Sequence, residues 1–198
     1  MALSARSAAV LFCLALGGCG AGEPSRPALS LPTTGWTTHH DERRGFTVSL
    51  PEGWERAEKT VSPLLTEPRE VLAAATYPLR HRPTNCEAFA GGARQDLGPA
   101  DALVTIQERG FDHSSQWSDF PPRPASFVMK RAEPPEPACG DRPGTETWWL
   151  PFTDAGRHFY ALVVIGPDAS RRVHEEAFAL IDTLRFDPAV QPDWQASG

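Results

Sequence analysis

Two apolar segments and one amphipathic segment follow one another between Thr145 and Phe186. In the first, TETWWLPF, neighbouring side chains point to opposite faces of a strand, so Trp148 and Trp149 diverge. The second, RHFYALVVIG, is apolar on both faces, which is typical of a strand in the middle of a sheet. Residues 153–156 between them predict a short hairpin loop closed by a glycine bulge.

A helix is predicted to follow, capped by Asp168 or by Ser170 and continuing to Phe186. Its charged side is typical of a solvated surface. Its apolar side should lie on the sheet and consists of Val173, Ala177, Leu180, Ile181 and Leu184.

Further elements are expected earlier in the chain. Residues 45–50 alternate and predict a strand, and a second strand covers 101–108. Asn85 can cap a helix over 86–97, although Gly91-Gly92 disfavours it. A strand over 69–77 is expected to place Leu72 and Ala74 on one face, and on the other Val71, Ala73, Ala75 and Tyr77.

These elements predict an α+β fold, in which helices pack on a mostly antiparallel β-sheet. The fold should form a single domain over residues 36–188, followed by a disordered tail over 189–198. Between 111 and 144 the prolines cluster around one short expected strand, 126–130. We interpret that region as a surface loop, with a proline-rich docking ligand as the alternative.

The amino-terminal residues have the pattern of an export signal. Arg6 and an apolar run too short to span a bilayer precede Leu16-Gly17-Gly18-Cys19, which matches the lipobox of bacterial lipoproteins. We expect residues 1–18 to be a signal peptide, and Cys19 to carry lipid chains such as palmitate. The alternatives are an ordinary secretory signal or a chance cysteine. Residues 19–35 should form a flexible tether with a reach of about 20 to 25 Å.

This anchor would place the domain in the bacterial cell envelope, on a membrane without spanning it. In a cell with two membranes, Gly20 in place of an aspartate favours sorting to the outer one.

Cys13 leaves with the signal peptide, so Cys86 and Cys139 remain in an oxidising space and are predicted to form a disulfide. The alternative is a redox or metal role, but the chain has no Cys-x-x-Cys motif.

The formal charge of -6 and the absence of a Lys/Arg stripe argue against a nucleic-acid partner. His39-His40-Asp41-Glu42 offers metal-type ligands. Adjacent side chains on an extended segment diverge, however, and a metal site usually needs a third ligand from elsewhere in the chain, so no metal is expected. Residues 112–115 contain the residue types of a catalytic triad too close together to form one. We therefore expect no catalytic residue and no cofactor.

The aromatic residues that could line a ligand groove are Trp54, Trp148, Trp149 and Tyr160.

Two phrases, GFTVSLPEGW at 45–54 and ALIDTLRF at 179–186, resemble bacterial lipoproteins of the PsbP-like superfamily, which includes the LpqN and DcrB types. The resemblance covers 35–188 and implies an α/β sandwich with a mostly antiparallel sheet. Its phrases mark strands and turns and carry no catalytic residue. By analogy alone it implies a binding or accessory role.

The leading functional hypothesis is therefore a monomeric, non-catalytic binding or accessory module that acts on another envelope component, with a protein of the envelope as its partner. The alternative is a carrier or sensor of a small apolar ligand, held in a pocket between sheet and helix. That alternative requires an internal cavity, so a filled sheet–helix interface would argue against it. A hydrolase is the third and least supported hypothesis.

Overall fold

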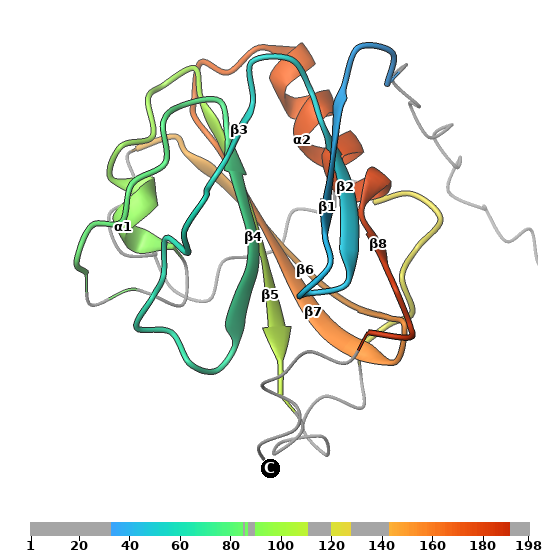
Figure 1. The fold of residues 1–198 in the computed structure, drawn as a ribbon. Helices are drawn as coiled ribbons and strands as arrows, with labels where there is room; N and C mark the ends of the chain where they lie inside the picture. The colour runs from blue at the N-terminus through green and yellow to red at the C-terminus, as the bar shows by residue number, and fades with distance from the viewer. Residues whose placement is uncertain (1–32, 85, 87–89, 111–119, 128–142, 191–198) are drawn as a thin grey trace, which may run out of the picture.

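The computed structural model describes residues 33–84, 86, 90–110, 120–127 and 143–190 (Figure 1). The larger of its two antiparallel sheets contains, in spatial order, β3 (Glu55–Arg56), β4 (Arg69–Ala75), β5 (Ala102–Arg109), β7 (Arg157–Ile165) and β6 (Glu146–Asp154). The smaller sheet contains β1 (Thr37–Asp41), β2 (Phe46–Leu50) and β8 (Arg185–Phe186). The helices are α1 (Gly91–Arg94) and α2 (Arg171–Thr183). This confirms the predicted single-domain α+β fold with mostly antiparallel sheet.

Several predictions fall outside the described residues. They are the signal peptide, the lipid site at Cys19 and most of the tether; Asn85 and Cys139; the 112–115 cluster; the end of the 126–130 strand; and most of the tail. The described residues 126 and 127 are not part of a strand.

β6 and β7 form the predicted hairpin, paired from Glu146 with Ile165 to Asp154 with Arg157. Its loop differs from the prediction, because Asp154 pairs directly with Arg157 and only two residues connect the strands. Ala155 and Gly156 both have positive φ, at 50° and 73°. This is the backbone of a two-residue type I′ turn, whose twist matches that of the strands, and it needs no bulge.

Helix α2 begins at the second of the two predicted caps. The Ser170 hydroxyl accepts the Val173 N–H at 3.3 Å. The predicted end at Phe186 is wrong, since the helix stops at Thr183 and the chain enters β8. Phe186 stacks there on Phe159 with ring centroids 3.9 Å apart, and this packing explains why the last residues join the sheet.

The predicted faces of β4 need one correction. The register shifts between Glu70 and Leu72, as in a β-bulge. Val71 consequently packs in the same core cluster as Leu72 and Ala74, not with the other three residues predicted to share its face.

Helix α1 is much shorter than the 86–97 helix that the sequence predicts. The chain passes so close to Arg82 that a Cβ at Gly92 would overlap the Arg82 carbonyl oxygen. Glycine at position 92 therefore serves close backbone approach more than helix formation.

Two core clusters occupy the two faces of the five-stranded sheet. The larger lies between that sheet, the three-stranded sheet and α2, while the smaller lies under α1 and the segments that flank it. In Figure 1 the two helices accordingly stand on opposite sides of the large sheet. The apolar side of α2 faces the larger cluster as predicted, with Ala177, Leu180, Ile181 and Leu184 fully buried.

Candidate functional site

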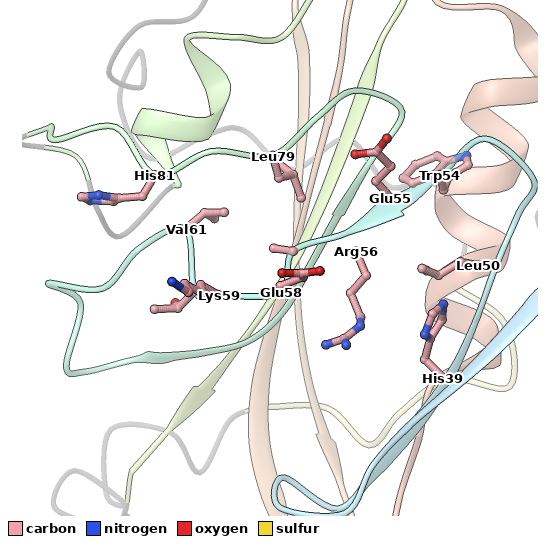
Figure 2. A pocket seen from close by; sticks show the side chains of 12 residues that line it. His39, Leu50, Trp54, Glu55, Arg56, Glu58, Lys59, Val61, Leu79 and His81 are labelled. Atoms are coloured by element: carbon pink, nitrogen blue, oxygen red, sulfur yellow. The ribbon is translucent and has the colours of Figure 1, made fainter.

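A groove of about 780 Å³ lies where the open edge of the five-stranded sheet meets the three-stranded sheet (Figure 2). Strand β1 and the end of β2 form one side, and the chain after β4 contributes to the far end. The lining residues are His39, Leu50, Leu79, His81 and every residue from Trp54 to Val61.

The continuous lining from Trp54 to Val61 locates the groove relative to the backbone. Side chains of an extended segment alternate between two faces, so a groove lying on one face would touch every second residue. Here consecutive residues around β3 all line it. The groove therefore runs along the edge of β3, beside the main chain.

Hydrogen bonding along β3 shows which backbone groups face that edge. Arg56 is paired with Ala74, while the neighbouring Ala57 donates its N–H to the Ala73 oxygen at 2.9 Å. Hydrogen-bonded and non-hydrogen-bonded pairs alternate in an antiparallel ladder. Arg56 is thus at a non-hydrogen-bonded position, and its N–H and C=O point away from β4 toward the groove.

The Arg56 side chain also enters the groove. Figure 2 shows its guanidinium between Glu58 on one side and His39 on the other. The side chain is half-buried. Among the described residues it has no hydrogen bond or ion pair, so the guanidinium keeps its full donor capacity for another molecule.

His39 lies across the groove from Arg56 and is affected by it. Partial burial lowers the pKa of His39 below its usual value of 6.5, and the positive charge of Arg56 lowers it further. The imidazole is therefore neutral at pH 7 and can both donate and accept a hydrogen bond. This side of the groove offers a neutral hydrogen-bonding ring rather than a second cation.

Trp54 forms part of the apolar lining and connects the groove to α2. Its ring is buried, and its Nε1–H donates to Glu176 Oε2 at 3.1 Å. The other oxygen of Glu176 accepts from Arg172 Nε at 2.7 Å. The indole is thus held by the helix and presents a fixed apolar surface to the groove, together with Leu50, Val61 and Leu79.

The four aromatic residues predicted to line a groove do not come together. Trp54 alone lines this one. Trp148 packs in the larger core cluster, with its ring centroid 5.5 Å from that of Phe178 in α2. Trp149 and Tyr160 lie on the opposite face of the sheet, with ring centroids 4.3 Å apart. The prediction that Trp148 and Trp149 diverge is confirmed.

Arg56 was not identified from the sequence, because β3 has only two residues and shows no periodicity. The signal that could have indicated the groove is the mixed-charge run ERAEK, which follows directly after the phrase GFTVSLPEGW. His39 was considered only as a metal ligand. Which strand edges meet across the two sheets depends on tertiary structure that no local pattern encodes.

The metal-type residues at 39–42 diverge in the structure. His39 faces the groove, whereas His40 Nδ1 is 2.9 Å from Thr47 Oγ1 on the exposed side of β1, and Asp41 accepts the Arg44 N–H at 2.9 Å. Within the described ranges, no group of three or more His, Cys, Asp or Glu could hold a metal ion.

Cys86 is described and its predicted partner Cys139 is not, so the disulfide stays a prediction.

Comparisons with known proteins find no family model that matches the chain and no curated protein with significant sequence similarity. The PsbP-like resemblance therefore remains a prediction that depends on its two short phrases.

None of the helices in the described part of the chain is long and apolar enough to cross a membrane.

Proposed function

We propose that this chain is a non-catalytic binding module of the bacterial cell envelope, anchored to a membrane through Cys19, which binds an envelope protein in the groove beside β3. The observation that carries the proposal is the groove itself. It combines apolar residues around Trp54 with a guanidinium and backbone groups at Arg56 that have no partner among the described residues. Seven of the twelve lining residues are polar or charged, among them Glu55, Glu58 and Lys59. A lining of this mixed kind suits a protein segment, which carries both polar and apolar groups.

The packing between sheet and helix favours this proposal over a carrier of small apolar ligands. A carrier of that kind needs space between the five-stranded sheet and α2. Leu180 and Ile181 are fully buried there, and Trp148 meets both Phe178 and His174 edge-on. The groove opens at the edge of the sheet, where a partner can reach it without entering the core.

Photo-crosslinking in the native cell tests the proposal. A benzoylphenylalanine at Glu58, an exposed position of the groove, is compared with one at Glu175, on α2 outside the groove lining. We expect a discrete protein adduct from position 58 and none from 175. The Cys19→Ala variant serves as the unanchored form and should lose both lipidation and that adduct. No adduct from position 58, or equal adducts from both positions, would contradict the proposal.

A further inference from the structure

Arg56 presents three kinds of group to one place. Its N–H and C=O face the groove because β3 is the edge strand and Arg56 is at a non-hydrogen-bonded position. Its guanidinium enters the same groove and has no ion pair within the described residues. A ligand that satisfies all three must carry a backbone-like donor and acceptor next to an anionic group.

The shape of the groove supports an extended ligand. Its lining includes every residue from Trp54 to Val61, so it follows the main chain through the edge strand β3 and beyond it. A strand edge that has no neighbour among the described strands is the template on which a peptide adds as a further strand. A hydrocarbon chain in the same position would cover the backbone groups of Arg56 without bonding them, which is unfavourable.

We infer that the groove receives an extended segment of the partner protein, which adds as a strand beside β3 and places an aspartate or glutamate carboxylate on the Arg56 guanidinium. This inference rests on the proposed function, since it names the form in which the envelope partner is recognised. The guanidinium can hold a carboxylate through two parallel hydrogen bonds. The apolar lining at Leu50, Trp54 and Leu79 accepts the neighbouring apolar side chains of the segment.

His39 contributes specificity on the opposite side of the groove. Because the imidazole is neutral, it does not compete with Arg56 for the carboxylate as a second cation would. It can bond to a carbonyl or hydroxyl of the segment from the β1 side. On the β1 side the carboxylate is thereby directed to Arg56, while Lys59, which also lines the groove, lies farther along it near Val61.

Selection from a random peptide library tests the inference directly. The probe is a phage-displayed library of random dodecapeptides, selected on the full-length protein in nanodiscs. The best peptide is synthesised, and its affinity is measured by fluorescence anisotropy. We expect selected peptides to share an acidic residue at a fixed position. Arg56→Gln should weaken binding by about tenfold to a hundredfold, the range for a lost hydrogen bond to a charged group.

Arg171→Gln provides a charge-matched control, because the Arg171 side chain is 81% exposed on α2 and is outside the groove lining. It should leave the affinity within about twofold of the parent, as is usual for an exposed ion pair. A peptide whose acidic residue is replaced by lysine should bind poorly to the parent and regain affinity with Arg56→Glu. Strand addition should also slow hydrogen exchange of the Arg56 amide, a readout that contact through the side chain alone would not change.

The outcomes separate this inference from the proposed function. If position 58 crosslinks to a protein in cells but the library yields no binder, the proposed function stands and the inference fails. It also fails if the selected peptides lack a shared acidic residue, if Arg56→Gln and Arg171→Gln have equal effects, or if Arg56 exchange is unchanged. If position 58 yields no protein adduct, or only a lipid adduct, both proposals fail.

Discussion

The carboxylate of Glu70 holds the backbone of Val61, accepting its N–H at 3.0 Å through one oxygen while the other accepts the Ser62 N–H at 3.0 Å. Val61 is the last residue of the chain segment that lines the groove. A single side chain of β4 therefore fixes the end of this segment against the sheet. The position of the groove lining depends on one nearly buried acid.

The Glu70 interaction predicts a specific pH dependence. Burial raises the pKa of Glu70 above its usual 4.5, and the hydrogen bonds from Val61, Thr60 and Ser62 offset only part of that increase. Because the folded-state pKa is the higher one, Glu70 adds stability below about pH 4.5 that is lost as pH rises through the folded-state pKa. The free energy of unfolding of the parent minus that of Glu70→Gln should thus fall as the pH rises above about 4.5. A difference that is constant or grows with pH in urea titrations would contradict this.

Removing Arg56 should raise the pKa of His39. The positive charge of Arg56 is the second cause of the lowered value, so Arg56→Gln removes it while burial remains. The pKa should move toward 6.5 without reaching it. NMR titration of the imidazole protons measures this, with Arg171→Gln as the control that should leave His39 unchanged. An identical titration curve in Arg56→Gln would show that the two groups are not close.

The turn between β6 and β7 should be improvable. Ala155 adopts a φ of 50°, a left-handed conformation that costs an alanine about 1 kcal/mol. Asparagine followed by glycine is the favoured pair for a type I′ turn, and Gly156 already supplies the second of these residues. We expect Ala155→Asn to raise the melting temperature by about 2 to 4 °C, and the control Gly156→Ala to lower it. Scanning calorimetry measures both, and a lower melting temperature for Ala155→Asn would contradict the assigned turn.

Arg157 and Glu108 form a buried ion pair whose side chains are 1% and 0% exposed. Two hydrogen bonds, at 2.7 and 2.9 Å, join them, and Arg157 also donates to the Arg44 carbonyl at 3.0 Å. Arg157→Met alone should cost about 3 to 5 kcal/mol, because it removes the two charge-assisted hydrogen bonds of a carboxylate that stays buried. Adding Glu108→Met should recover much of that loss. Chemical denaturation checks both, and equal stability of single and double variants would refute this account.

The predicted disulfide can be tested by thiol counting. A bridge between Cys86 and Cys139 would close a loop of roughly fifty residues and contribute about 4 kcal/mol. Cys86→Ala, Cys139→Ala and the double variant should then lose stability equally, since each breaks the same bond. Two free thiols in the denatured, unreduced mature protein, together with unchanged melting temperatures in the variants, would rule the bridge out.

Local patterns predicted the fold well where one periodicity extends over many residues. The alternation in β6, the apolar run in β7 and the apolar side of α2 each identify an element and its buried face. The predictions failed where a tertiary contact decides. The bulge at Glu70 moves Val71 to the other face, and contact with Phe159 draws Phe186 into β8. The groove depends on the edges of β1 and β3 meeting, which neither strand encodes alone.

The three-stranded sheet combines the first two strands of the described chain with the last, since Phe46 in β2 is opposite Phe186 in β8. A chain that is synthesised or exported from its amino terminus therefore produces β1 and β2 long before β8 becomes available. Until the five-stranded sheet and α2 are also complete, the apolar side of β2 has no permanent cover, and such surfaces bind holdase chaperones or aggregate. Assembly of the domain should accordingly be slow and late, governed by its longest-range contact rather than by its early hairpin.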